Sequence, residues 1–372
     1  MKALRQEPSI MMTKSENKPL KNLSITSHFL RSLTLHRLFR FSRVALQNLL
    51  FRESQWQGEY SRSLSTCLDI ERFLNFLTGR SIAHYVEGVV LYTQNDLEVQ
   101  HQQQSQSGTS DTERNLQLVG LCRSIVARIG NLRFVTICAP PSTLARLVCC
   151  AIQTQDAWAF DMPLHVLHLS RPLDRADPVS LPAPQAFDLL HLLPWTHCTL
   201  NEGSSLKVYN TYEYYSKTSP SILNQFPYLA EKSAPVPLSR SMKTVDYIAI
   251  FPLLGYHSSI FGFLQRLPSV EKLGMQLVPH PDDRIFENQS RVETALLADM
   301  WLEFKADYRR VLQNVLIHSR EVGGEIGGIT EFTSYDYGMK GIQTIIDESC
   351  KDYLYDWRDC GNGHWQLRDK LE

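Results

Sequence analysis

The sequence lacks several features that would assign it to a common functional class. Its 38 Lys and Arg residues nearly cancel its 39 Asp and Glu residues, so the chain has no global field that would attract nucleic acid or an acidic membrane. None of its eight cysteines forms a C-x-x-C pair, which excludes the usual spacing of zinc and redox motifs. Most of these cysteines lie in apolar runs, where thiols act as small hydrophobic groups, so we expect a reducing compartment, the cytoplasm or the nucleus.

No apolar segment has the form of a secretion signal or a membrane span. The longest uncharged stretch, residues 247–265, is interrupted in its middle by Pro252, Gly255 and two serines. A strand, a turn and a helix explain this stretch better than a membrane-spanning helix, so we expect no membrane partner.

Catalytic motifs are also missing. There is no G-x-S-x-G nucleophile turn and no cysteine in a recognisable nucleophile signature. The glycine-rich turn at residues 323–328 lacks the Lys and Ser or Thr of a phosphate-binding loop, and it follows a predicted helix instead of a strand. We therefore predict a non-enzymatic protein with no cofactor.

Four histidines are the best candidates for a metal site. His165 and His168 lie at the two ends of one predicted strand, and His191 and His197 are nearby in the sequence. Residues three apart on a strand face opposite ways, so His165 and His168 should not converge on one ion. We expect ordinary hydrogen-bonding histidines and no metal. The carboxylate pairs Asp282 with Asp283 and Asp352 with Asp356 fall in polar turns, where solvation explains them.

What the sequence does contain is a recurring strand pattern, clearest between Val245 and Leu277. Apolar residues at positions 1, 4 and 6 match the L-x-x-L-x-L strand of a leucine-rich repeat, in which positions 4 and 6 point into the core. Two such runs, 245–250 and 270–275, flank a helical segment that Ser258 could cap.

The same spacing begins at six places: residues 30, 86, 132, 164, 245 and 270. Segments of helical spacing lie between most of them, and the longest follows residue 297. We predict an α/β fold, a single irregular leucine-rich-repeat-like solenoid over residues 23–372, with a curved parallel sheet and outer helices. The segment 39–51 is predicted to become helical, 195–200 to be a weaker strand, and Trp357 and Trp365 to flank a closing hairpin.

Two segments are predicted to be disordered. Residues 1–22 form a polar, basic tail, and residues 94–114 form a Gln-rich insertion with almost no aliphatic side chains. Residues 1–52 carry ten basic side chains against two acids, which would also suit nucleic-acid binding or a mitochondrial presequence. A solvated tail is the simpler interpretation.

A solenoid of this kind offers a concave face lined by the strand residues that alternate with the core, and such faces commonly bind other proteins. The predicted protein-binding residues are Tyr92, Thr136, His168, Tyr247, Phe251 and Gln276. The tyrosine cluster 209–215 could instead stack nucleic-acid bases or grip a peptide, but few basic residues accompany it. Packing under a long loop is favoured, and nucleic acid remains the alternative partner.

The segments 195–223, 245–279 and 301–316 and the tryptophan-flanked ending together resemble a large group of filamentous-fungal F-box proteins. The resemblance spans roughly residues 28 to 367. It implies an irregular leucine-rich-repeat-like domain that selects an unknown protein substrate for a ubiquitin ligase. In this family an N-terminal F-box passes the substrate to a Skp-type adaptor and a cullin. Residues 1–27 lack the Leu-Pro helix start of an F-box, so these two partners are expected only if an F-box is restored or replaced.

Overall fold

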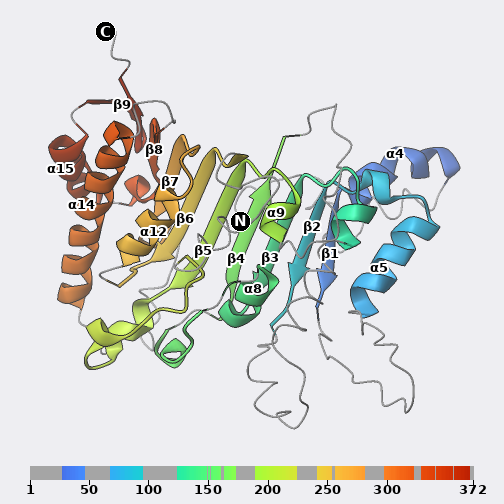
Figure 1. Cartoon of the computed structure of the whole chain (residues 1–372), viewed down its shortest axis with the longest axis horizontal. Coiled ribbons are helices and arrows are strands. Elements are labelled where there is room, and N and C mark those ends of the chain that lie inside the picture. Colours follow the sequence, from blue (N-terminus) through green and yellow to red (C-terminus); the bar gives the residue numbers. More distant parts are fainter. Residues whose placement is uncertain are drawn as a thin grey trace.

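The computed structural model describes residues 27–46, 68–94, 124–148, 150, 152–160, 163–172, 189–223, 241–253, 256–280, 297–321, 328–339, 341–354 and 356–368. These residues form a mixed α/β structure around one ten-stranded sheet (Figure 1). Strand order runs β1-β2-β3-β4-β5-β6-β7-β8-β10-β9, and the described edge strands do not meet, so the sheet is open. The expected tail at 1–22 and nearly all of the Gln-rich insertion and of the turn at 323–328 lie outside the described residues.

The strands are β1 (Phe41–Ala45), β2 (Gly88–Tyr92), β3 (Phe134–Ala139), β4 (His165–Ser170), β5 (His197–Ser204), β6 (Thr244–Ile250), β7 (Lys272–Gln276), β8 (Glu331–Ser334), β9 (Trp357–Gly361) and β10 (His364–Leu367). The helices are α4 (His28–Phe39), α5 (Leu68–Gly79), α8 (Pro141–Leu147), α9 (Leu189–Leu192), α12 (Tyr256–Gln265), α14 (Leu297–Glu321) and α15 (Gln343–Tyr353). Short 3-10 turns are η1 (Ala83–Tyr85), η2 (Ala157–Ala159), η3 (Leu206–Asn210), η4 (Tyr214–Ser216) and η6 (Tyr335–Gly338). In Figure 1, α4 and α5 lie at the β1 end of the sheet, and α14 and α15 lie at the other end.

Most of the sheet is parallel, as the sequence predicts, but two strands run in the opposite direction. β1, β2 and β3 pair in parallel, and so do β5, β6, β7 and β8. β4 is antiparallel to both of its neighbours, and β10 is antiparallel to β8 and β9. The prediction that the run at 164 joins a parallel series is therefore wrong. Apolar and polar side chains alternate in the same way whether a strand runs up or down in the sheet, so this pattern cannot specify strand orientation.

One backbone arrangement recurs where each parallel strand begins. The carbonyl just before a strand accepts two N–H groups from the start of the next strand. Arg40 O accepts from residues 87 and 88, Lys243 O from residues 271 and 272, and Glu271 O from residues 330 and 331, over 2.8–3.0 Å. The starts of neighbouring strands are thereby aligned.

This alignment places equivalent core residues in two rows. One row contains Val89, Val135, Leu169, Cys198, Val245, Leu273, Phe332 and Trp365, and the other contains Val44, Leu91, Ile137, Leu167, Leu200, Tyr247 and Met275. All are buried and belong to one hydrophobic core with apolar residues of α5, α8, α9, α12, α14 and α15. The helices therefore cover the face of the sheet from which these rows project.

The predicted frame of β6 is wrong, although its neighbour β7 is correct. Val245 pairs with Leu273 and Tyr247 with Met275, so the buried residue Met242, and not Val245, is equivalent to Val270. Paired residues of β6 and β7 are therefore 28 positions apart in the sequence, not 25. Both frames of β6 are apolar, so hydropathy alone could not select between them.

The N-terminal region also differs from the prediction. The run at Leu30, Leu33 and Leu35 lies in helix α4, where Ser27 Oγ accepts the backbone N–H of Leu30 over 3.1 Å and caps the helix. The strand is β1, within the segment expected to be helical. Apolar residues three positions apart are compatible with a helix as well as with this strand pattern. The cap at Ser27 favours the helix. Ser258 does not cap α12, because that helix begins at Tyr256.

Other elements are confirmed. Helices occupy the predicted segments in α5, α8, α14 and α15, and β9 and β10 form the closing hairpin between the two tryptophans. The weak strand candidate at 195–200 is realised as β5.

A buried carboxylate completes the end of β7 and supplies a test of the fold. Asp336 accepts the N–H of Leu277 with both oxygens and the N–H of Val278 with Oδ1, all at 3.0 Å. Asp336→Ala would leave two buried N–H groups without acceptors and should lower the free energy of unfolding by about 2–4 kcal/mol. Urea unfolding of this variant and of the exposed control Asp352→Ala, expected to stay within about 0.5 kcal/mol of the parent, measures the difference. Equal stability of the two variants would contradict the role of Asp336.

Candidate functional site

The candidate site is the face of the sheet opposite the core, here called the open face. It consists of the strand residues that alternate with the buried rows. The apolar residues of the described helices pack against the buried rows, on the opposite side of the sheet. Its central row contains Arg43, Val90, Thr136, His168, Thr199, Asp246, Gly274, Thr333 and His364. Most of these side chains are half-buried or exposed, in contrast to the core rows.

A chain of hydrogen bonds crosses the middle of the open face. His197 Nε2 lies 3.0 Å from Asp246 Oδ2 and 3.1 Å from Thr199 Oγ1. The other carboxylate oxygen of Asp246 accepts the Tyr335 hydroxyl over 2.8 Å. Burial, followed by the Asp246 charge, raises the pKa of Tyr335 above its ordinary value, so this hydroxyl remains a donor.

Gly274 makes that chain possible. A Cβ built at residue 274 would overlap Asp246 Oδ1 and lie 2.8 Å from the Tyr335 ring. Tyr335 follows β8, so its side chain must pass over β7 to reach β6, and only a residue without a side chain leaves that path clear.

This arrangement does not have the geometry of a catalytic triad. In a triad one imidazole nitrogen faces the carboxylate and the other faces the nucleophile. Here Thr199 and Asp246 share the same nitrogen of His197. Within the described residues no group of three His, Cys, Asp or Glu side chains could hold a metal ion. The chain of hydrogen bonds instead holds neighbouring strands in a fixed arrangement.

Aromatic rings occupy the β1–β4 part of the open face, and arginines lie beside them just before β1 and β3 begin. Phe41 lies 5.7 Å from Phe134, and Phe134 stacks at 6.1 Å on His168. The guanidinium groups of Arg40 and Arg133 lie 5.3 and 5.2 Å from the rings of Phe41 and Phe134. Both arginines also contact Glu87 Oε2, at 3.1 and 3.3 Å.

Four of the six predicted binding residues lie on the open face: Tyr92, Thr136, His168 and Gln276. The Tyr92 ring lies beneath the Arg43 guanidinium at 4.5 Å. Thr136 Oγ1 is 2.8 Å from His168 Nδ1, and the Gln276 amide donates to Val278 O over 3.0 Å. Burial, with a smaller contribution from His197, lowers the pKa of His168 to about 4, so the imidazole is neutral at physiological pH.

The other two predicted binding residues, Tyr247 and Phe251, are corrected by the structure, because both are 1% exposed. The Tyr247 hydroxyl donates to the buried Glu202 over 2.9 Å on the helix-covered side of the sheet. Phe251 has a left-handed backbone, with φ of 49°, and packs edge-on against Trp301 of α14. Tyr247 was misplaced by the frame error in β6. Phe251 lies beyond the strand, where alternation no longer applies.

The histidines behave as the strand geometry requires. His165 is buried on the core side of β4, while His168 lies on the open face, so the two do not converge. Burial lowers the pKa of His165 to about 3. His165 is thus a neutral core residue, and neither of its ring nitrogens has a hydrogen-bond partner.

The tyrosine cluster is partly packed and partly exposed. Tyr209 is buried and its hydroxyl donates to Glu303 of α14 over 2.9 Å, and the Tyr214 hydroxyl donates to Asp299 over 3.4 Å. Tyr212 and Tyr215 are 90% and 73% exposed. The predicted packing therefore holds for the first residue of the cluster but not for all of it.

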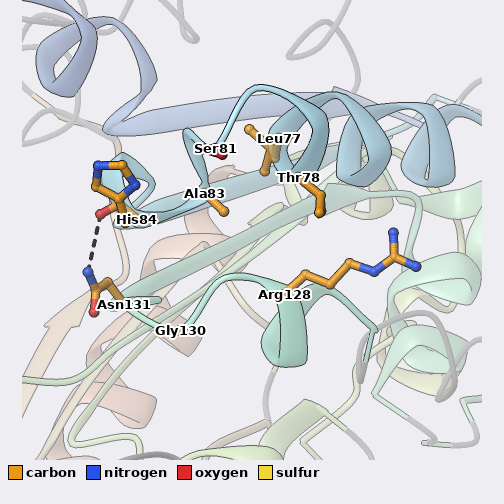
Figure 2. Close-up of a pocket in the computed structure, with 8 residues that line it drawn as sticks. All are labelled: Leu77, Thr78, Ser81, Ala83, His84, Arg128, Gly130 and Asn131. Carbon is orange, nitrogen blue, oxygen red and sulfur yellow. Dashed lines mark hydrogen bonds between the residues drawn. The ribbon is translucent and has the colours of Figure 1, made fainter. Parts of the chain in front are cut away.

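A separate recess lies between the end of α5, η1 and residues 128–131 (Figure 2). It has a volume of about 460 Å³ and is lined by Leu77, Thr78, Ser81, Ala83, His84, Arg128, Gly130 and Asn131. The Asn131 amide donates to the His84 carbonyl over 3.2 Å, and Arg128 donates to Asn75 over 3.0 Å. The first bond joins the turn at residues 130–131 to η1, and the second joins the helical segment 124–128 to α5. No nucleophile with an adjacent base is described among the lining residues.

The comparisons with known proteins supply no relative from which a function could be transferred. No family model matches the chain, and no curated protein or solved structure is significantly similar to it. Among the described helices, none combines the length and hydrophobicity needed to cross a bilayer.

Several residues of the site were not identified from the sequence: Arg40, Glu87, Arg133, Asp246, Gly274 and Tyr335. A signal for the first three was present. A polar residue follows the apolar residue at position 1 just before every parallel strand. These polar residues are Arg40, Glu87, Arg133, Thr196, Lys243, Glu271 and Thr330. The partner of Asp246 depends on a contact between segments 89 residues apart, which no local pattern reports.

His165 yields a prediction for pH dependence. Its pKa is about 3 in the folded protein and about 6.5 in the unfolded chain, so the unfolded state binds the extra proton between these values. This histidine therefore costs stability as pH falls below 6.5, by about 1.4 kcal/mol per pH unit. Relative to the parent, His165→Leu should become more stable by that amount per unit between pH 6.5 and 4.5.

The measurement is urea unfolding of parent and variant across this range. The exposed His36→Gln variant controls for the simple loss of an imidazole. A stability difference between parent and His165→Leu that does not change with pH would contradict the assignment. Asp336 contributes in the opposite sense, because burial raises its pKa to about 7, and comparison with the parent cancels that contribution.

Gly274 yields a second prediction. Gly274→Ala should displace Tyr335 from Asp246 and lower the free energy of unfolding by about 1–3 kcal/mol, because the added methyl group has no space. The matched control is Gly262→Ala in α12, where a Cβ meets nothing within 4 Å. That variant should be stabilised by about 0.5–1 kcal/mol. Thermal unfolding distinguishes the two, and stabilisation by both substitutions would be inconsistent with the close contact at residue 274.

Proposed function

We propose that this chain is a non-enzymatic protein-interaction module that binds a protein partner through its open face. The observation that carries the proposal is the contrast between the two faces of one sheet. One face is covered by helices, and the other presents ordered polar and aromatic side chains that are only half-buried. Ordered aromatic and polar groups on a rigid scaffold are characteristic of protein interfaces.

The dimensions of the open face suit this role. Strands lie about 4.8 Å apart and rise about 3.3 Å per residue, so nine strands of about five residues span on the order of 600 Å². A stable complex buries about 800 Å² on each partner. The strands of the open face therefore span about three quarters of the area that one partner of a stable complex buries.

We further propose that the architecture is an irregular leucine-rich-repeat-like solenoid. The shared positions 1, 4 and 6 and the polar residue after position 1 support this, since they recur across the parallel strands with aligned starts. The antiparallel strand β4 and the uneven repeat lengths make the solenoid irregular.

The role of this module is proposed to be substrate selection for a ubiquitin ligase. The sequence resemblance to filamentous-fungal F-box proteins is its sole support. A Skp-type adaptor and a cullin are the corresponding partners, on the condition that an F-box is supplied.

Nucleic-acid binding through the tyrosine cluster is less well supported. The hydroxyl groups of Tyr209 and Tyr214 donate to the carboxylates of Glu303 and Asp299. A phosphate backbone at this position would lie beside two acids, which repel it.

Substitutions on the open face test the proposal. Val166 and Ile248 are half-buried on this face, in the centre of the sheet. Val166→Arg combined with Ile248→Arg should abolish binding of the specific partner while leaving the far-UV circular dichroism unchanged. Leu302→Arg on α14, where the leucine is 67% exposed, is the matched control and should retain the partner.

Quantitative co-purification with tagged parent and variants is the measurement. A partner retained equally by both variants would place its binding site elsewhere on the molecule. Recovery of a Skp-type protein and a cullin with the parent chain would support the ligase role, and a specific partner without them would refute it.

A further inference from the structure

We propose that a second surface of this chain, separate from the open face, binds a proline-rich segment of a partner protein that also carries a basic residue. This surface, here called the aromatic patch, consists of Trp158 in η2, Tyr212 and Glu213 between η3 and η4, and Tyr215 in η4. The proposed function concerns the open face, so the aromatic patch adds a further binding site that does not depend on it.

The aromatic patch holds three of the four most exposed large aromatic side chains among the described residues. Trp158 is 62% exposed, and Tyr212 and Tyr215 are 90% and 73% exposed. Tryptophan and tyrosine carry large apolar surfaces, which are commonly packed against the rest of the protein. Exposed rings gathered on neighbouring loops are therefore typical of a binding surface.

Two loops from separate parts of the chain meet to form the aromatic patch. The Lys207 amine donates to the Trp158 carbonyl over 2.8 Å, and the Lys217 amine lies 5.4 Å from the centre of the Trp158 ring. Asp156 accepts the backbone N–H of Thr218 over 3.0 Å and lies 3.5 Å from the Lys217 amine. The two loops are thus held side by side. The yellow-green segment that follows β5 lies beyond the ends of the strands, at the lower left of Figure 1.

The segment that carries the tyrosines is held in one conformation. Glu213 has a left-handed backbone, with φ of 59°, which a residue with a side chain rarely adopts unless its surroundings enforce it. Its carbonyl accepts both the backbone N–H and the hydroxyl of Ser216, over 3.0 and 2.8 Å. The neighbouring Tyr214 packs at 5.0 Å on the buried Tyr209 and donates to Asp299 of α14. Exposed rings on a segment fixed in this way lose less conformational entropy when a ligand binds.

The polar ends of the three rings can donate hydrogen bonds to a ligand. Within the described part of the chain, no hydrogen bond involves Trp158 Nε1 or the hydroxyl groups of Tyr212 and Tyr215. A proline-rich segment offers the complementary groups, because proline has a carbonyl but no N–H. Such a segment forms a polyproline II helix, whose carbonyls make no internal hydrogen bonds. Proline rings can therefore pack on the aromatic rings while the carbonyls accept hydrogen bonds from their polar ends.

Glu213 provides a contact for a basic residue of the ligand. Its side chain is exposed, it lies between the two tyrosines in the sequence, and no cation among the described residues forms an ion pair with it. Lys217 is already paired with Asp156. A Lys or Arg beside the prolines of a ligand would therefore be attracted by the Glu213 carboxylate.

A nucleic acid fits the aromatic patch less well. Its phosphates would lie beside the carboxylates of Glu213 and Asp156, and the positive charge of Lys217 is offset by Asp156. Bases stack on free ring faces, but the Lys217 amine lies over one face of Trp158. A proline-rich segment can use the part of the ring that remains exposed.

Four fluorescein-labelled probes test the inference by fluorescence anisotropy with the full chain. They are a peptide of eight prolines with a lysine at each end, four Gly-Ser repeats with the same ends, eight prolines with a glutamate at each end, and a single-stranded oligothymidylate. The lysine-ended proline peptide should bind about tenfold more tightly than the flexible Gly-Ser peptide. It should bind about threefold more tightly than the glutamate-ended peptide, since exposed ion pairs are weak.

Substitutions place the peptide on the aromatic patch. Trp158→Ala and Tyr212→Ala should each weaken binding of the lysine-ended proline peptide about fivefold, because each removes one ring. Glu213→Gln should abolish the difference between the lysine-ended and glutamate-ended peptides. Phe76→Ala on α5, where the ring is 46% exposed, is the matched control and should bind as the parent does. All four variants should keep the thermal unfolding midpoint of the parent, because each changes an exposed side chain.

Tryptophan fluorescence provides a second readout that reports on the ring itself. The difference in emission between the parent and Trp158→Phe belongs to Trp158. Saturating lysine-ended proline peptide should protect this component from quenching by acrylamide, and the Gly-Ser peptide should not.

Equal binding of the lysine-ended proline peptide and the Gly-Ser peptide, or no binding of either, would overturn the inference. Loss of the proline peptide from the open-face variant Val166→Arg with Ile248→Arg would also overturn it, because that variant leaves the aromatic patch intact. Tighter binding of the oligothymidylate than of the proline peptide would assign the aromatic patch to nucleic acid instead. None of these outcomes decides the proposed function, which depends on whether the open-face variant releases the protein partner.

Discussion

The structure depends on a backbone interaction that is repeated at the start of each parallel strand. A single carbonyl just before the strand accepts two N–H groups from the next strand. Once the starts are aligned in this way, strand alternation determines which side chains enter the core and which reach the open face. A shift of one residue would exchange the two sets, so burial of the core rows also fixes the composition of the open face.

The aligned starts bring polar side chains of successive strands to about 4.8 Å spacing. The residue after position 1 alternates in charge along parts of the sheet, as in Arg40, Glu87 and Arg133 and in Lys243 and Glu271. Half-exposed pairs of this kind contribute little to stability, commonly less than about 1 kcal/mol each. Their larger effect is on the electrostatic potential of the edge.

Much of the fold could be predicted from the sequence, because burial on one face of a parallel sheet imposes a regular spacing. That spacing identified β2, β3, β6 and β7 and the helices between them, but it is insensitive to strand direction and so missed the reversal of β4. In β6 both Val245 with Tyr247 and Ile248 with Ile250 give apolar alternation, and the error of frame there moved Tyr247 onto the wrong face. The interactions across the open face could not be predicted, since Tyr335 and Asp246 meet only after the pairings of β6 with β7 and of β7 with β8 have brought their strands to either side of β7.

Two glycines show how the open face is kept ordered. Gly88 lies between Phe41 and Phe134, and a Cβ there would lie 2.7 Å from the Phe41 ring. Gly274 lies between Tyr335 and Asp246 in the same way. Glycine within a strand costs roughly 0.5–1 kcal/mol, because the unfolded chain gains freedom. In each case the loss is offset by an aromatic side chain that crosses a strand and contacts the strand beyond it. Each ring is held across the sheet instead of standing free in solvent, so its position is fixed by two strands besides its own. Each of these two glycines thus stabilises the order of three neighbouring strands, and the arrangement of side chains on the open face follows from that order.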